Sequence, residues 1–143
     1  MPDDPRPAGE TDLGAMLASL EIDVRPGRYV FVSVPRGRLL RVDVQPLAMV
    51  TEAEGTTYVV HQEDADRDGY HYDFVGAWLT LAVHSSLGAV GLTAALSTAL
   101  ARAAIPANVL AGTYHDHVLV PVDRVDEAVA TLLALRARPD GEP

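Results

Sequence analysis

The chain has 143 residues, which is enough for one compact domain or two small subdomains that share a core. It contains no cysteine, and this excludes disulfides, thiolate nucleophiles and cysteine-based zinc or iron–sulfur sites. The chain has no lysine, which excludes Schiff-base chemistry and a P-loop lysine. Its formal net charge of −9 argues against binding to a phosphate backbone.

All 11 basic residues are arginines, and their loose groups at 25–28 and 36–41 are more typical of solvated turns than of a nucleic-acid patch. Residues 1–10 are proline-rich and acidic, and we expect them and residues 137–143 to form disordered or flexible tails. The sequence has neither a signal peptide nor a run of about 18 apolar residues. It therefore predicts a cytoplasmic protein with no membrane and no nucleic-acid partner.

The first half of the chain is expected to form an N-terminal subdomain over residues 11–76. Its expected elements are a short helix capped by Thr11, strands over residues 29–34, 47–52 and 56–61, and a short helix or loop over 62–69. The helix would bury one face, and Pro26 and Gly27 would turn the chain into the first strand.

The second half is expected to form a C-terminal subdomain over residues 77–136. Its expected elements are a buried strand over 77–83, a turn over 84–88, a helix over 90–103, strands over 107–113 and 118–120 joined by a tight connection over 114–117, and a helix over 124–136 capped by Asp123. This order matches a ferredoxin-like βαββαβ unit without its last strand. The first half resembles the same unit without its first strand. The sequence thus predicts an α+β, ferredoxin-like fold of two interlocked half-units that exchange a strand.

Two patterns raise the possibility of a metal site. Asp64, Asp66, Asp68 and Gly69 match the start of an EF-hand loop, but Val75 stands where that loop needs a bidentate glutamate. An acidic, solvated turn is the favoured interpretation.

The second pattern consists of His115 and His117, with His84 as a further ligand. A turn between strands would break their alternation, so structural histidines are favoured over a metal-assisted hydrolase at this place. The neighbouring Ser85 and Ser86 lie in no G-x-S-x-G motif, and no catalytic residue is predicted. We expect the protein to need no cofactor and not to be an enzyme.

The turn before the helix over 90–103 is the best candidate for a binding site. Ser85, Ser86, Gly88 and Gly91 surround a predicted helix start that directly follows a buried strand. Unpaired N–H groups and the positive end of the helix dipole lie there, and small side chains let a ligand approach the backbone. A carboxylate would fit this place. The alternative, equally supported by the residues, is that Ser86 caps the helix and Gly91 permits tight packing.

Residues 84–95 and 105–121 read HSSLGAVGLTAA and IPANVLAGTYHDHVLVP. They resemble the patterns H-S-S-L-x-A-V-G-L-T-A and N-V-x-A-G-Y-Y-H-D-H-x-x-V-P of bacterial ACT-domain proteins related to the CASTOR arginine sensors and to aspartokinase-type ACT regulatory domains. The resemblance implies an ACT-like ferredoxin fold with two interlocked half-units. It also implies a regulatory module that binds an amino acid, often across the interface of a homodimer.

Carried over position by position, the resemblance implies twelve ligand-binding residues. These are Ser85, Ser86, Leu87, Val90 and Gly91 at the loop and helix start, and Asn108, Val109, Gly112, Thr113, Tyr114, His115 and Asp116 on the facing strand and turn. The helix start would take the ligand's carboxylate, and Asn108, strand carbonyls and Asp116 would take its ammonium group. The alternative function is a protein–protein interaction module without a small ligand, which would use a sheet edge or the face that carries Trp78.

Overall fold

The computed structural model describes residue 9 and residues 11–137, so the predicted tails lie outside the described residues except for Gly9 and Ala137. The elements in chain order are α1 (Leu13–Ala18), β1 (Ile22–Pro35), β2 (Ala48–Thr51), β3 (Gly55–His61), α2 (Gln62–Asp68), β4 (Val75–Leu81), α3 (Leu92–Arg102), β5 (Asn108–Ala111), β6 (Asp116–Pro121), the 3-10 turn η1 (Val122–Arg124), α4 (Val125–Leu133) and the 3-10 turn η2 (Ala134–Ala137). No helix among these residues is long and apolar enough to cross a membrane.

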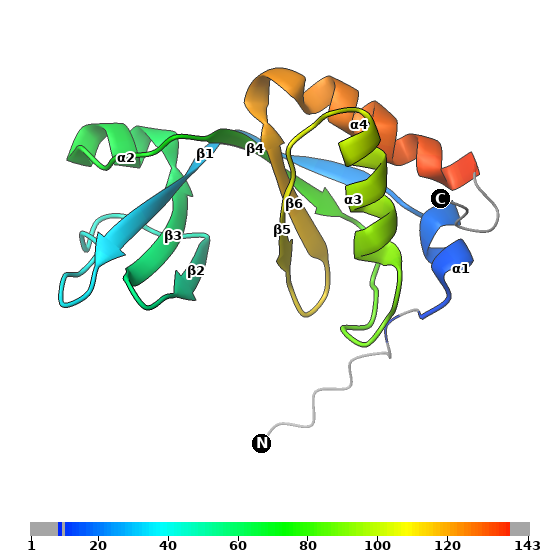
Figure 1. The fold of residues 1–143 in the computed structure, drawn as a ribbon, viewed down its shortest axis with the longest axis horizontal. Helices are drawn as coiled ribbons and strands as arrows, with labels where there is room; N and C mark the ends of the chain where they lie inside the picture. The colour runs from blue at the N-terminus through cyan, green and yellow to red at the C-terminus, as the bar shows by residue number, and fades with distance from the viewer. Residues whose placement is uncertain (1–8, 10, 138–143) are drawn as a thin grey trace.

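The six strands form one antiparallel sheet in the order β2-β3-β1-β4-β6-β5. The sheet is strongly curled (Figure 1) and has two lobes. The N-terminal lobe contains β2, β3, the end of β1 and α2, and the C-terminal lobe contains β4, β6, β5, α1, α3 and α4. The long strand β1 joins them, because its residues 22–30 pair with β4 and its residues 29–35 pair with β3. An antiparallel sheet with helices confirms the predicted α+β class.

Strand β1 corrects two expectations about the first half. Pro26 and Gly27 do not form a turn before the strand; they lie inside it, where the register with β4 shifts between Arg25 and Tyr29. Gly27 has a φ of +110°, and the Tyr29 hydroxyl donates a hydrogen bond to the Pro26 carbonyl at 2.5 Å. A β-bulge accepts both a residue without an N–H and a residue in a left-handed conformation. The first half therefore has the first strand of the βαββαβ unit, which was expected to be missing. It lacks the first helix of that unit, because residues 36–47, between β1 and β2, form no helix.

The helix starts also differ from the expectation in detail. Asp12, not Thr11, is the N-cap of α1, and its carboxylate accepts a hydrogen bond from the Ala15 N–H at 2.7 Å. Asp123 lies inside η1 and does not cap α4, which begins two residues later and has no side-chain cap. Helix ends that form a 3-10 turn are not visible in the hydrophobic pattern, which is the same for both helix types over one turn.

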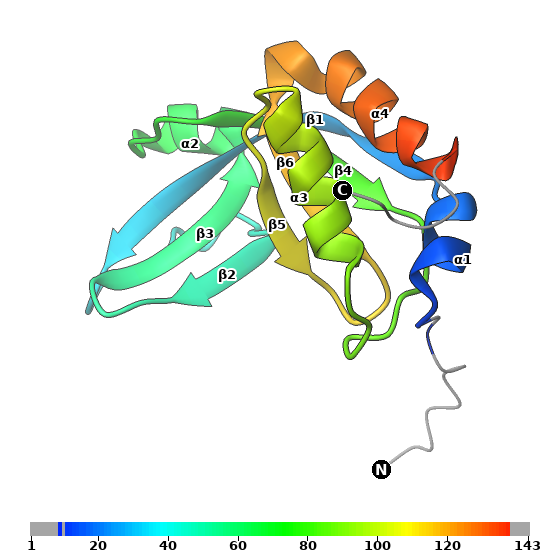
Figure 2. The same ribbon diagram turned by 45° about the vertical axis from the view of Figure 1, so that its right-hand side comes forward.

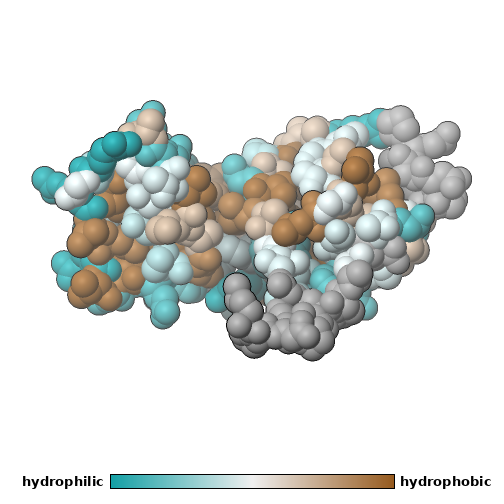
Figure 3. Space-filling model, turned by 90° about the horizontal axis from the view of Figure 1, so that it is seen from below, coloured by the Kyte–Doolittle hydropathy of each residue, from teal (hydrophilic) through white to brown (hydrophobic). Residues whose placement is uncertain are grey.

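The two lobes bury their side chains in separate clusters. In the C-terminal lobe α1, α3 and α4 pack on one face of β4, β6 and β5, and α3 and α4 lie next to one another (Figure 2). In the N-terminal lobe α2 and the connection over residues 36–47 bury a smaller set: Val30, Val32, Val44, Val60 and Ala65. Hydrophobic residues also reach the surface over this lobe (Figure 3), among them Met49 and Val50 of the edge strand β2.

A third cluster lies on the opposite face of the sheet, where the curl brings the lobes together. It consists of Tyr29, Val59, Trp78 and Leu119 with partly buried neighbours. Trp78 is only 5% exposed, and Tyr29 and His117 pack against its ring. The face that carries Trp78 is thus largely buried within the chain, and it does not offer the open surface that the interaction-module alternative requires.

Candidate functional site

A cavity of about 400 Å³ lies where the β4–α3 connection, the first turn of α3 and the β5–β6 hairpin meet. We call it the helix-start cavity. Its lining residues are Ser85, Ser86, Leu87, Ala89, Val90, Gly91, Leu92, Thr93, Ala94, Ala111 and Asp116. A cavity of this size is within the range of about 300–1,000 Å³ that is typical of small-molecule sites.

Helix α3 opens onto the cavity without a side-chain cap. Its N-cap is Gly91, and the helix begins at Leu92, two residues later than expected. The Ser86 hydroxyl accepts a hydrogen bond from the Gly88 N–H at 3.2 Å and so stabilises the preceding turn instead of the helix. The N-cap therefore offers no side-chain acceptor to the N–H groups of the first turn, and the positive end of the helix dipole faces the cavity.

Gly91 is favoured at the N-cap by its backbone conformation and by the space around it. Its φ of +107° is a left-handed conformation, which residues with a side chain rarely adopt. A Cβ atom at this position would also lie 2.9 Å from a methyl carbon of Leu13, which belongs to α1. The N-terminal segment approaches the cavity at a second place, because Gly9 lies directly against the backbone of Ser85 and Ser86.

Strand alternation decides which residues of the β5–β6 hairpin face α3. Ala111 pairs with Asp116, and both line the cavity. Asn108 pairs with Leu119, which belongs to the cluster on the opposite face of the sheet. Because successive side chains of a strand point to opposite faces, Asn108 lies on the face away from α3. It is not positioned to bind a ligand in the cavity.

The structure brings six of the twelve predicted residues into the lining: Ser85, Ser86, Leu87, Val90, Gly91 and Asp116. The other six lie elsewhere: Asn108, Val109, Gly112, Thr113, Tyr114 and His115. Val109 packs into the core of the C-terminal lobe, and residues 112–115 form the hairpin turn. Leu92, Thr93 and Ala94 also line the cavity and were not predicted. They form the first turn of α3 after Gly91, and this turn can be identified only when the helix start is known.

His117 lies behind the hairpin, on the opposite face of the sheet. Its Nδ1 accepts a hydrogen bond from the Trp78 indole N–H at 3.2 Å and lies 3.0 Å from the Thr80 hydroxyl. An indole N–H only donates, so Nδ1 is unprotonated and the proton of the neutral ring is on Nε2. Burial lowers the pKa of His117, and the nearby His115 and Arg25 lower it further, while Asp116 opposes the shift.

The histidines do not converge on a common point. The His117 ring is bound to Trp78 and Thr80, whereas the His84 ring packs against Tyr114 with 5.8 Å between the ring centroids. Among the described residues no group of three or more histidines, aspartates and glutamates is arranged to hold a metal ion. The arrangement offers no metal-assisted hydrolysis at this place.

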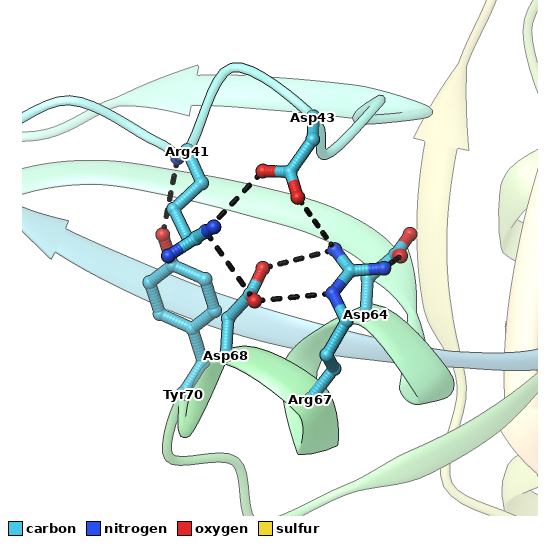
Figure 4. A network of polar contacts seen from close by, with 6 residues as sticks. All are labelled: Arg41, Asp43, Asp64, Arg67, Asp68 and Tyr70. Carbon is cyan, nitrogen blue, oxygen red and sulfur yellow. Dashed lines mark hydrogen bonds and ion pairs between the residues drawn. The ribbon is translucent and has the colours of Figure 1, made fainter.

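The aspartates that resemble an EF-hand loop lie on α2, and two of them, Asp64 and Asp68, contact arginines (Figure 4). The Arg67 guanidinium lies 2.9 Å from the Asp64 carboxylate and 3.0 Å from that of Asp68. The Asp66 carboxylate accepts a hydrogen bond from the Tyr72 hydroxyl at 2.6 Å. Asp64 and Asp68 are thus engaged by an arginine and Asp66 by a tyrosine, and no group of three acidic or histidine residues among the described ones is arranged to hold an ion.

The same cluster attaches the connection over residues 36–47 to α2. The Arg41 side chain lies 3.2 Å from Asp43 and 3.3 Å from Asp68, and the Arg41 N–H donates to the Tyr70 hydroxyl (Figure 4). The hydrogen bond from Arg41 lowers the pKa of Asp43, and the neighbouring charges of Arg41 and Arg67 act in the same direction. We call Arg41, Asp43, Asp64, Arg67, Asp68 and Tyr70 the α2 network.

Comparison with known proteins agrees with this architecture. Two models of the ACT domain match the sequence, one over residues 8–77 and the other over residues 74–134. A crystal structure of a Vibrio cholerae protein of unknown function, VC0802, described as a possible transport protein, is 37% identical to this chain. The match covers 87% of this chain and 95% of that protein, with a TM-score of 0.79. The chain belongs to the ACT-domain family.

Other ACT-domain structures share the fold at low sequence identity. Aspartate kinase from Clostridium acetobutylicum is 12% identical, with a TM-score of 0.59, over 80% of this chain and 34% of the kinase. The ligand-free regulatory subunit of aspartate kinase from Thermus thermophilus is 9% identical, with a TM-score of 0.54, over 80% of this chain and 95% of that subunit. This ACT-domain protein therefore resembles regulatory parts of aspartate kinases in fold. No curated protein matches its sequence significantly.

Proposed function

We propose that this ACT-domain protein is a non-catalytic regulatory module that binds an amino acid in the helix-start cavity. The observation that carries the proposal is the uncapped first turn of α3, which opens onto a cavity of about 400 Å³. The N–H groups and the dipole of this turn can bind a carboxylate.

The charge of the lining supports an amino acid over other carboxylates. Among the lining residues that the structure describes, Asp116 is the charged one, and it belongs to the β5–β6 hairpin and not to α3. A negative group there repels phosphates and dicarboxylates but attracts an ammonium group. Leu87, Ala89, Val90 and Ala111 add apolar surface that a ligand side chain can contact. A molecule with a carboxylate at one end and an ammonium group at the other fits both sides.

The sheet order supports the view that the fold consists of two interlocked ACT-like half-units. The sets β2-β3-β1-β4 and β1-β4-β6-β5 each have the strand order of a βαββαβ unit, and they share the pair β1 and β4. In this proposal the first part of β1 supplies the last strand of the C-terminal half-unit. The N-terminal half-unit has residues 36–47 in place of its first helix.

Exposed apolar side chains around the cavity support the association of two copies. Leu87 is 70% exposed and Val90 is 84% exposed, and both belong to the rim. A second copy packed on this rim would remove them from water and close the cavity, as expected for a C2 homodimer. Light scattering of the wild type and of Val90→Glu tests this point; a wild-type monomer at all concentrations contradicts it.

A thermal-shift screen against the twenty amino acids tests the proposed function. A ligand at about one hundred times its Kd stabilises the native state by about 2.7 kcal/mol, which raises the unfolding midpoint by several degrees. We expect a selective shift that is clearly smaller in Asp116→Asn and that Asp23→Asn, a substitution of an exposed acidic residue outside the cavity, leaves unchanged. If no amino acid shifts the midpoint and a protein partner is retained instead, the interaction-module alternative replaces this proposal.

A further inference from the structure

A second cavity, of about 520 Å³, lies in the curl of the sheet between the two lobes. We call it the curl cavity. It is lined by Arg25 of β1, His61 at the end of β3, Asp64 of α2, and Asp43, Gln45, Pro46 and Leu47 of the connection before β2. None of these residues lines the helix-start cavity.

One wall of the curl cavity carries a positive charge without a partner. The Arg25 guanidinium lies 5.8 Å from the centre of the Trp78 ring and forms no ion pair with the residues that the structure describes. His61, beside it, packs its ring against Tyr29 with 4.9 Å between the centroids. A guanidinium held over an aromatic face keeps its N–H groups at the edge, where they can bind a carboxylate with two parallel hydrogen bonds.

Another part of the lining carries two carboxylates that ion pairs fix in place. The Asp43 and Asp64 carboxylates lie 3.4 Å and 2.9 Å from the Arg67 guanidinium, as part of the α2 network (Figure 4). Arg41 lowers the pKa of Asp43, so this group stays ionised at neutral pH. The network holds residues 41–43 against α2, and the wall is formed before any ligand arrives.

We propose that the curl cavity is a second ligand site and that it binds a small zwitterion of the amino-acid class. The ligand's carboxylate binds Arg25, and its ammonium group lies against Asp43 and Asp64. Gln45 adds an amide that can donate or accept a hydrogen bond. The acidic wall disfavours phosphates and other multiply charged anions, and the charged walls disfavour apolar ligands.

This proposal is independent of ligand binding in the helix-start cavity, and calorimetry of Asp116→Asn separates the two sites. In that variant we titrate each of the twenty amino acids and then, for any that binds, the matching amine without the carboxylate and the matching acid without the ammonium group. We expect saturable binding of an amino acid and no binding of either analogue. A carboxylate bound to Arg25, which lies over the Trp78 ring, should also change the fluorescence of this single tryptophan.

The decisive variant is Arg25→Gln in the Asp116→Asn background. Removing a charge-assisted bidentate hydrogen bond is expected to weaken binding by about tenfold or more. Arg36→Gln is the matched control, because Arg36 is exposed, follows the other end of β1 and does not line the cavity. Unchanged affinity in Arg25→Gln overturns the proposal, as does binding of the amine or the acid as strongly as the amino acid. If Asp116→Asn alone abolishes all binding, the curl cavity is not a site, and the proposal for the helix-start cavity stands.

Discussion

The two lobes share one sheet but are stabilised by different forces. In the C-terminal lobe three helices cover the sheet, and the core extends from Met16 of α1 to Leu132 of α4. In the N-terminal lobe one short helix and an irregular connection cover the sheet, and five buried side chains form the core. The α2 network adds ion pairs there, where the apolar contacts are few.

This difference follows from the residues between the first two strands of each half. After β4 the chain forms the 11-residue helix α3, which buries Leu92, Leu96 and Leu100. After β1 the corresponding segment, residues 36–47, contains three arginines, one glycine and one proline, and Val44 is its one residue buried in the core. A segment without an amphipathic period cannot bury a helical face, so polar contacts hold it. Apolar packing therefore stabilises the C-terminal lobe, whereas ion pairs add to a small apolar core in the N-terminal lobe.

The largest effect is expected from the core of the C-terminal lobe. Leu96 is fully buried between α3 and the sheet, and Leu96→Ala should lower the free energy of unfolding by about 2–5 kcal/mol, because it leaves a cavity in a rigid core. Val60→Ala in the N-terminal lobe removes fewer methyl groups from a smaller cluster and should cost about 1–2.5 kcal/mol. Urea unfolding measures both. A larger loss in Val60→Ala would contradict the comparison.

A smaller effect with a different salt dependence is expected from the α2 network. The Asp68 side chain is 4% exposed and contacts both Arg41 and Arg67, so Asp68→Asn should destabilise the protein less than Leu96→Ala does. The difference from the wild type should shrink as salt screens the wild-type ion pairs. Asp73→Asn is the matched control, since Asp73 is exposed and pairs only with His71 in the described part of the chain. If the loss of unfolding free energy in Leu96→Ala depends on salt as strongly as that in Asp68→Asn, the proposed difference between the lobes is wrong.

The smallest effect concerns the cluster where the lobes meet. The folded state lowers the pKa of His117, chiefly through burial, so this residue binds fewer protons in the folded state than in the unfolded state. Its contribution is present above about pH 6.5, the usual pKa of histidine, and is lost progressively as the pH falls below that value. Unfolding measured from pH 5 to pH 7.5 should show a steeper loss of stability in the wild type than in His117→Gln. Parallel curves would contradict the lowered pKa of His117 in the folded state.

Much of the fold could be predicted from hydrophobic periodicity, and the errors have a common cause. The strand at residues 77–83 and the helix at 90–103 correspond to β4 and α3 because their apolar residues repeat regularly. The first seven residues of β1, residues 22–28, were missed because Pro26 and Gly27 are typical of turns, whereas here they form a bulge in a strand that both lobes share. Pairing with β4, which is distant in sequence, overrides the local preference.

The structure brings part of the predicted site together around one cavity and places the other predicted residues elsewhere. The turn after β4 and the hairpin residue Asp116 lie together, as the sequence pattern indicated. Asn108 was misplaced because its orientation depends on the register of β5 with β6, which pairs it with Leu119. The curl cavity was not predicted at all. Its walls come from β1, β3, α2 and a connection, and only the curl of the sheet brings them together.

The most direct test of the account is an NMR titration of ¹⁵N-labelled protein with each of the twenty amino acids. For a ligand whose carboxylate binds the start of α3, the amide resonances of Leu92, Thr93 and Ala94 should move most, and their movement should saturate. The same titration of Asp116→Asn should leave them in place. If the amino acids move none of these amides in the wild type, the helix-start cavity is not an amino-acid site and the proposed function is wrong.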